Sequence, residues 1–217
     1  MLPFSRGRRA VSIGARSSDF DSAGMHSDPI AWFAEWFAKA SQAGIPKHNA
    51  MTLATVAPDG RPSARIVLLS SFDARGFVFH TNYESEKAVE IARNPWVALT
   101  FWWDPLGWQV RIEGRAERTT AEESDAYFAN RPRGSQLGAW ASDQSRTIES
   151  RAVLETRVRQ LDDKYRAAFV PRPPYWGGYR VRPYAIEFWE DRQDRLHERV
   201  RFERGEEGDW RSLRLAP

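Results

Sequence analysis

Residues 51–81, MTLATVAPDGRPSARIVLLSSFDARGFVFHT, decide the fold class of this chain. The stretch contains three apolar runs rich in strand-forming residues and two turns between them: runs Met51–Val56, Ala64–Leu69 and Phe77–Thr81, turns Pro58–Pro62 and Asp73–Gly76. Short turns of this kind join antiparallel neighbours, because a parallel pair needs a crossover of about a dozen residues or more. The stretch therefore predicts a three-stranded antiparallel meander.

The segments on both sides of the meander add helices and further strands. Upstream, Asp28 followed by Pro29 is typical of a helix N-terminus, and Gly44–Pro46 predicts the end of that helix. Downstream, we expect helices at about Ser85–Arg93, from a capping box of Thr119 and Glu122 through Asn130, and at 149–166, a linker at Pro171–Pro174, and strands at Trp96–Trp103, Trp108–Arg118, Tyr179–Val181, Ala185–Trp189, Arg199–Glu203 and Trp210–Leu215. This pattern predicts an α+β fold, an antiparallel barrel with peripheral helices.

The composition excludes several classes of partner and site. Lys plus Arg is 32 and Asp plus Glu is 29, so the net charge is only +3 and the basic residues are dispersed among acids. We therefore expect no nucleic-acid partner. No apolar run approaches the roughly 20 residues that cross a bilayer, so we expect no membrane partner. The chain has no Cys, which excludes disulfides and thiolate chemistry and fits a cytoplasmic location.

The N-terminal residues 1–18 are rich in Arg and Ser and contain no acid. This composition is typical of a transit peptide or of a disordered tail, and a third alternative is that translation begins at Met25. We divide the chain into a disordered tail, 1–27, and one folded domain, 28–217.

Motifs for nucleotide-loop, triad and zinc-protease chemistry are missing from the sequence, and its four His residues are scattered, so we expect no metal. What remains is a set of anion-binding and ring-binding groups. Thr81 and Lys87 occur where a strand runs into a helix N-terminus, which favours an anion site. Arg195, His197 and Arg199 alternate, so a strand would place them on one side.

Six segments resemble the pyridoxamine 5′-phosphate oxidase family in the same order: MTLATVAPDGRPSARIVLL, FHTNYESEKAVEIARNP, WQVRIEGRAER, YFANRPRGSQLGAWASDQS, YWGGYRVRPYAIEFW and RLHERVRFER with the final LRLAP. The resemblance as a whole runs from about Asp28 to Pro217. The resemblance implies a homodimeric, antiparallel split β-barrel that binds FMN at the subunit interface. It also implies an FMN-dependent oxidase that converts pyridoxamine or pyridoxine 5′-phosphate into pyridoxal 5′-phosphate and reduces O₂ to H₂O₂.

The resemblance also implies roles for individual residues. The expected FMN-binding residues are Arg65, Ile66, His80, Thr81, Lys87, Gln109, Gln144, Ser145, Trp189 and Arg199. The expected substrate-binding residues are Tyr127, Arg131, Ser135, Arg195 and His197, of which Arg195 and His197 would lie over the substrate ring as catalytic residues. These residue types suit the task, because Arg binds phosphate through two hydrogen bonds and Gln both donates and accepts at the flavin edge.

The sequence departs from the family pattern at Ser70, where a Lys is usual, and at Glu86 and Trp108, where Arg is usual. The tail before Asp28 also lacks the usual Arg and Tyr. These departures leave a second candidate open, the flavin oxidases of phenazine biosynthesis, which act on reduced tricyclic acids and for which Trp102, Trp103 and Trp108 would form a wall. A third candidate is a non-catalytic flavin- or haem-binding split barrel, against which the intact RLHER segment argues.

Overall fold

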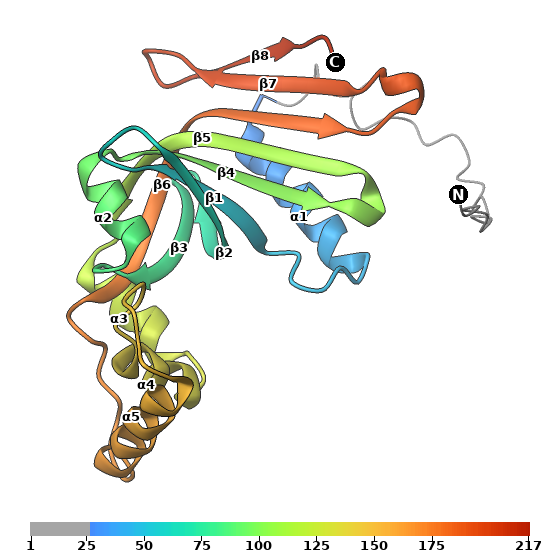
Figure 1. Ribbon diagram of the computed structural model, residues 1–217. Coiled ribbons are helices and arrows are strands. Elements are labelled where there is room, and N and C mark those ends of the chain that lie inside the picture. Colours follow the sequence, from blue (N-terminus) through green and yellow to red (C-terminus); the bar gives the residue numbers. More distant parts are fainter. Residues whose placement is uncertain (1–26) are drawn as a thin grey trace, which may run out of the picture.

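The computed structural model describes residues 27–217, so nearly all of the predicted tail, with Met25, lies outside the described residues. In the described part, eight strands form one antiparallel sheet in the order β3-β2-β1-β4-β5-β6-β7-β8. An additional pairing of β3 with β6 closes the first six strands into a barrel, and β7 and β8 extend from it (Figure 1). The predicted antiparallel split barrel is confirmed. The strands are β1 (Ala50–Val56), β2 (Pro62–Asp73), β3 (Gly76–Asn82), β4 (Trp96–Trp103), β5 (Trp108–Arg118), β6 (Trp176–Glu190), β7 (Glu198–Arg204) and β8 (Trp210–Arg214).

Strand β6 is one continuous strand of 15 residues, and the prediction of two shorter strands around Pro183 was wrong. The register with β5 shifts at this point, so that Gly114 pairs with Pro183 and Tyr184 is skipped. A bulge accommodates proline, which has no N–H to donate. Gly114 is required there, because a Cβ would lie 2.4 Å from the carbonyl oxygen of Arg182. The first half of β6 therefore pairs with β3 and the second half with β7.

Helix α1 (Pro29–Gln42) fills the interior beneath the sheet (Figure 1). Its N-terminus is capped as predicted, since Asp28 Oδ1 accepts a hydrogen bond of 2.8 Å from the backbone N–H of Ile30. Trp32 and Trp36 are fully buried and stack on Phe188 of β6 and Trp108 of β5. Aromatic rings of this size contribute much of the buried apolar area.

The predicted tryptophan wall is wrong for two of its three members. Trp103 and Trp108 are 1% and 7% exposed and belong to the barrel core, where the Trp103 indole donates to the carbonyl oxygen of His48. Only Trp102, which is 50% exposed, faces outward. Alternation along β4 and β5 accounts for this, because neighbouring side chains point to opposite faces of a sheet.

Helices α3 (Ala121–Ala129), α4 (Arg133–Ala141) and α5 (Arg151–Lys164) form an arm at the far side of the barrel from β7 and β8 (Figure 1). The capping box of α3 is formed by Thr120 and Glu123, one residue later than predicted. Helix α4 was not predicted, because the sequence RPRGSQ is typical of a polar turn. In the structure the helix is held by the packing of Leu137 against Phe128. No helix between residues 27 and 217 has the length and hydropathy needed to cross a bilayer. The remaining α-helix of the described residues is α2 (Glu86–Arg93), and 3₁₀ turns lie at Asp104–Leu106 and Gln193–Arg195.

Candidate functional site

A cleft of about 360 Å³ opens between the outer side of β2 and β3 and the helical arm. A second hollow of about 320 Å³ continues from it along α4. Both are lined by His80, Thr81, Arg131, Gln144 and Trp176. Together the two hollows gather a large part of the expected flavin and substrate residues from one chain: Arg65, Ile66, His80, Thr81, Lys87, Tyr127, Arg131, Ser135 and Gln144.

Lys87, in the first turn of α2, provides a buried cation at one end of the cleft. The residue is 8% exposed, and its Nζ donates to Thr81 Oγ1 at 3.3 Å, Ser85 Oγ at 3.2 Å and Gln144 Oε1 at 3.3 Å. Burial, with a smaller contribution from Arg65, lowers the pKa of Lys87. All three hydrogen-bond partners are neutral, so this end of the cleft is suited to an anion.

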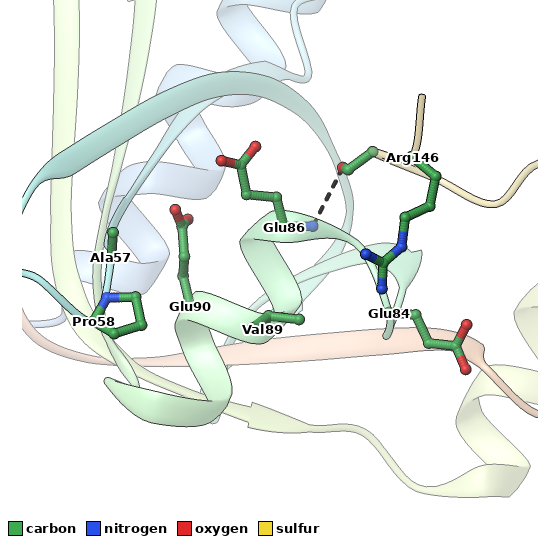
Figure 2. A pocket seen from close by; sticks show the side chains of 8 residues that line it. Ala57, Pro58, Glu84, Glu86, Val89, Glu90 and Arg146 are labelled. Atoms are coloured by element: carbon green, nitrogen blue, oxygen red, sulfur yellow. Dashed lines mark hydrogen bonds between the residues drawn. The ribbon is translucent and has the colours of Figure 1, made fainter. Parts of the chain in front are cut away.

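Ser145 lies beside the N-terminus of α2 and does not line the cleft. The backbone N–H of Glu86 donates a hydrogen bond of 3.2 Å to Ser145 Oγ. Both residues line a hollow of about 480 Å³, together with Glu90 and Arg146 (Figure 2). This bond ties the N-terminus of α2 to the loop that carries Gln144. Glu86 lines this hollow, and its carboxylate is not among the hydrogen-bond partners of Lys87 Nζ.

Arg65 of β2 is held in place by groups that the sequence did not single out. Its Nη2 lies 3.2 Å from Glu90 Oε2 and donates to Ser63 Oγ at 2.6 Å, while Nη1 donates to Thr55 Oγ1. Glu90 and Thr55 are 4% and 1% exposed. A buried carboxylate behind the guanidinium fixes its direction. The sequence feature that could have indicated this role of Glu90 is its position three residues after Lys87 on the buried face of a short helix.

Three aromatic rings stack in parallel along the wall of the cleft. The His80 ring lies 3.7 Å from that of Tyr127 and 5.2 Å from that of Trp176, at interplanar angles of 6° and 15°. A hydrogen bond of 2.8 Å joins Ser70 Oγ to His80 Nδ1. Burial, and then the charge of Arg131, lowers the pKa of His80 to about 4, so the imidazole is neutral at pH 7. Trp176 was not among the expected site residues.

Arg131 supplies the second cation of the cleft. Its guanidinium lies 4.5 Å from the centre of the Trp176 ring, and burial lowers its pKa. Its Nη1 is buried and has no hydrogen-bond partner among residues 27–217. A buried donor without a partner costs free energy, so this nitrogen marks a place for an acceptor. Ser135, in the first turn of α4, lines the same hollow.

Gln109, Trp189 and Arg199 form a second group on one face of β5, β6 and β7, and His197 of the preceding loop packs on Trp189. Gln109 pairs with Trp189, and Trp189 pairs with Arg199. The His197 ring lies 4.5 Å from the Trp189 ring. Trp189 follows Trp176 of the cleft by thirteen positions on β6, which is roughly 40 Å of extended strand. Neither hollow is lined by Gln109, Trp189, His197 or Arg199, so the two groups of expected site residues do not share a pocket there.

The expectation that one strand carries Arg195, His197 and Arg199 was wrong. Strand β7 begins at Glu198, and a 3₁₀ turn at Gln193–Arg195 precedes it. Asp194 and Arg195 have positive φ angles of 57° and 61°. Two successive left-handed residues end the extended run, and an alternating sequence gives no sign of them.

Arg199 is oriented by a buried carboxylate, much as Arg65 is. Its Nε and Nη2 lie 2.9 Å and 2.8 Å from Glu187 Oε1. Glu187 is 2% exposed and also accepts from Arg111 Nη1 at 3.2 Å. Glu187 stood inside the IEFW segment, but only the register across β5, β6 and β7 reveals what it contacts.

Large apolar side chains are exposed on the sheet face between the two groups. Ile66, Leu68 and Trp102 are 64%, 48% and 50% exposed. The register places them on one face with Gln109, because Ile66 pairs with Thr52, Thr52 with Thr100, and Trp102 with Gln109. An apolar area of this kind is typical of a protein–protein interface.

Comparisons with known proteins agree over nearly the whole described chain. Residues 37–165 match the family model described as pyridoxamine 5′-phosphate oxidase, and residues 176–217 match the pyridoxine 5′-phosphate oxidase C-terminal dimerisation region. The chain is 59% identical over 194 residues to a pyridoxine/pyridoxamine 5′-phosphate oxidase from Rubrobacter xylanophilus, covering 89% of each. It is 58% identical over 190 residues to one from Gloeothece citriformis, covering 88% of this chain and 89% of the relative.

A solved structure with a similar fold is that of PhzG from Burkholderia lata 383, in complex with tetrahydrophenazine-1-carboxylic acid. It superposes with a TM-score of 0.87 at 33% identity and covers 95% of this chain and 100% of its own.

Proposed function

Because the chain belongs to the pyridoxamine 5′-phosphate oxidase family, we propose that it is an FMN-dependent oxidase of pyridoxamine or pyridoxine 5′-phosphate. The products would be pyridoxal 5′-phosphate and H₂O₂. The observation that supports a phosphorylated substrate best is Arg131, whose buried Nη1 has no partner among residues 27–217. A phosphate oxygen at this nitrogen would remove the cost of the unsatisfied donor.

The residues around Lys87 fit the phosphate of FMN. A buried ammonium with neutral hydrogen-bond partners gains a counter-charge when a phosphate binds. Arg65, fixed by Glu90, would bind the same group, and Gln109 would donate and accept at the ring edge. When bound, FMN supplies the redox chemistry, taking two electrons from the substrate carbon and passing them to O₂.

The chain's own residues would bind and orient the substrate. Arg131 and Ser135 would hold its phosphate, and the stacked Tyr127 would border its ring. Arg195 and His197 would cover the ring from the second group. His80 remains neutral at pH 7, so it adds no positive charge beside Arg131.

We further propose that residues 28–217 act as a homodimer whose two copies share each site. The cleft and the Trp189 group lie at opposite ends of β6, and an exposed apolar face lies between them. If the faces of two copies meet, the cleft of one faces the Trp189 group of the other. The match of residues 176–217 to a dimerisation region supports this arrangement.

Subunit mixing tests the function and the shared site together. Lys87→Met damages the cleft and Arg195→Ala damages the second group, so each homodimer should lose H₂O₂ production with pyridoxine 5′-phosphate. In an equal mixture about half of the dimers are mixed, and each has one intact site, so about a quarter of wild-type activity should return. Failure to recover would refute the shared site. A wild-type enzyme that is saturated with FMN yet inactive on both vitamers would refute the substrate assignment.

A second candidate is oxidation of a reduced tricyclic carboxylic acid, which the ligand in the PhzG structure suggests. The observation that favours it is Ser70, whose hydroxyl lines the cleft and bonds neutral His80, so that this position adds no positive charge for a substrate phosphate. The higher identity to the vitamin B6 enzymes favours the first proposal. Rapid oxidation of a dihydrophenazine acid, with none of pyridoxine 5′-phosphate, would reverse this order.

A further inference from the structure

The loop between β6 and β7 gives the ring of His197 two competing partners. The backbone N–H of Arg192 donates a hydrogen bond of 3.2 Å to His197 Nδ1, and Asp191 Oδ1 lies 3.1 Å from the same nitrogen. Asp191 is anchored by its own backbone, since its N–H donates to the carbonyl oxygen of Gly107 at 2.8 Å. The backbone of Asp191 is therefore held in place, and its carboxylate lies beside the imidazole.

The two contacts require opposite states of one atom. A carboxylate accepts a hydrogen bond only from a protonated Nδ1, whereas a backbone N–H donates only to an unprotonated Nδ1. Protonation at Nδ1 leaves Nε2 as an acceptor in the neutral ring, and the reverse makes Nε2 a donor. The partner that prevails thus decides what the other side of the ring presents.

We propose that Asp191 is a positioning residue that keeps the proton of His197 on Nδ1 and so presents Nε2 to the substrate as a hydrogen-bond acceptor. The carboxylate prevails because a hydrogen bond to a charged acceptor is roughly twice as strong as a neutral one. Trp189, 4.5 Å from the imidazole, limits its rotation. The role of Nε2 rests on the proposed function, in which His197 covers the substrate ring.

The expected size of the effect is moderate, because the Asp191 side chain is 60% exposed and that of His197 is 21% exposed. Loss of one such hydrogen bond corresponds to a fall of about three- to tenfold in kcat. The KM for the phosphorylated substrate should stay within about twofold, because Asp191 is not among the residues that line the cleft around Arg131.

The test combines a spectroscopic and a kinetic measurement on the FMN-loaded protein. The ¹⁵N chemical shifts of the histidine rings report the tautomer, and a His197→Gln variant identifies the signals of His197. Wild-type protein should show Nδ1–H, and Asp191→Ala should show Nε2–H, since the N–H of Arg192 is then the remaining partner. Asp191→Asn should recover part of both the Nδ1–H population and kcat, because its amide oxygen still accepts.

Asp194→Asn is the matched control, since it removes the same charge from the same loop and Asn tolerates its positive φ of 57°. It should change neither tautomer nor kcat. The proposal is wrong if Asp191→Ala keeps Nδ1–H, or if it lowers kcat no more than the control does. An enzyme that oxidises neither vitamer would instead refute the proposed function, and the tautomer measurement would still decide the role of Asp191.

Discussion

Replacing Arg131 by methionine should separate substrate binding from stability. The side chain lies over Trp176 with its Nη1 buried and unsatisfied among the described residues. Methionine keeps apolar bulk against the indole but removes the buried donor, whose cost is about 1–3 kcal/mol. The lost cation–π contact offsets about 0.5–1 kcal/mol of this gain. The free energy of unfolding without ligands should therefore stay equal or rise by up to about 2 kcal/mol.

The same change should weaken binding of a phosphorylated substrate. A hydrogen bond to a charged group is worth about 1.5–3 kcal/mol, so KM for pyridoxine 5′-phosphate should rise about ten- to a hundredfold. Urea unfolding at one protein concentration and initial rates of H₂O₂ formation measure the two effects. Arg133→Met is the control, because Arg133 is an exposed partner of Asp162 at 2.8 Å and should change KM less than twofold. An unchanged KM, or a loss of more than about 1 kcal/mol of stability, would refute the reasoning.

Three further outcomes test other contacts of the cleft. Glu90→Gln should lower the stability of the FMN-free protein by about 2–4 kcal/mol in urea unfolding, because it leaves Arg65 without its buried carboxylate. The control Glu86→Gln, at an exposed residue, should change the stability by less than about 0.5 kcal/mol. Equal effects of the two substitutions would contradict this. The pKa of His80 in the folded state, about 4, lies below its unfolded value, so the unfolded state binds more protons. Stability that is present above about pH 6.5 is therefore lost as the pH falls towards 4. His80→Gln should flatten this part of the plot of unfolding free energy against pH. Ser70→Lys should lower KM for pyridoxine 5′-phosphate by adding a cation beside Arg131, and an unchanged KM would favour the tricyclic acid.

Local patterns predicted most of the barrel, because its strands are short and joined by turns with Gly, Pro and Asp. The meander from β1 to β3 follows from such turns alone. Strand β6 was not predicted as one element, since Pro183 signals a break and the bulge opposite Gly114 depends on a partner strand. Helix α4 was missed for a similar reason, because its buried side is defined by α3 and α5 rather than by its own sequence.

The site shows the same division between local and non-local information. The resemblance named Arg65 and Arg199, and both lie where carboxylates of other elements hold them. It did not name Glu90, Glu187 or Asp191. Glu90 contacts Arg65 from a helix, Glu187 contacts Arg199 across the sheet, and Asp191 lies beside His197 across a loop. The spacing of these residues in the sequence does not reveal such contacts.

Four cations of the site differ in whether a carboxylate of the chain pairs with them. Arg65 and Arg199 have carboxylate partners within the chain, so their geometry is fixed before any ligand binds. Lys87 and Arg131 have no carboxylate within ion-pair distance in residues 27–217, and burial lowers the pKa of both. In the proposed function, each of these two groups would gain its counter-charge from a phosphate, so binding of two phosphates would offset the cost of burying the two cations. Two such cations, one in the first turn of α2 and one just after α3, would suit an enzyme whose cofactor and substrate each carry one phosphate.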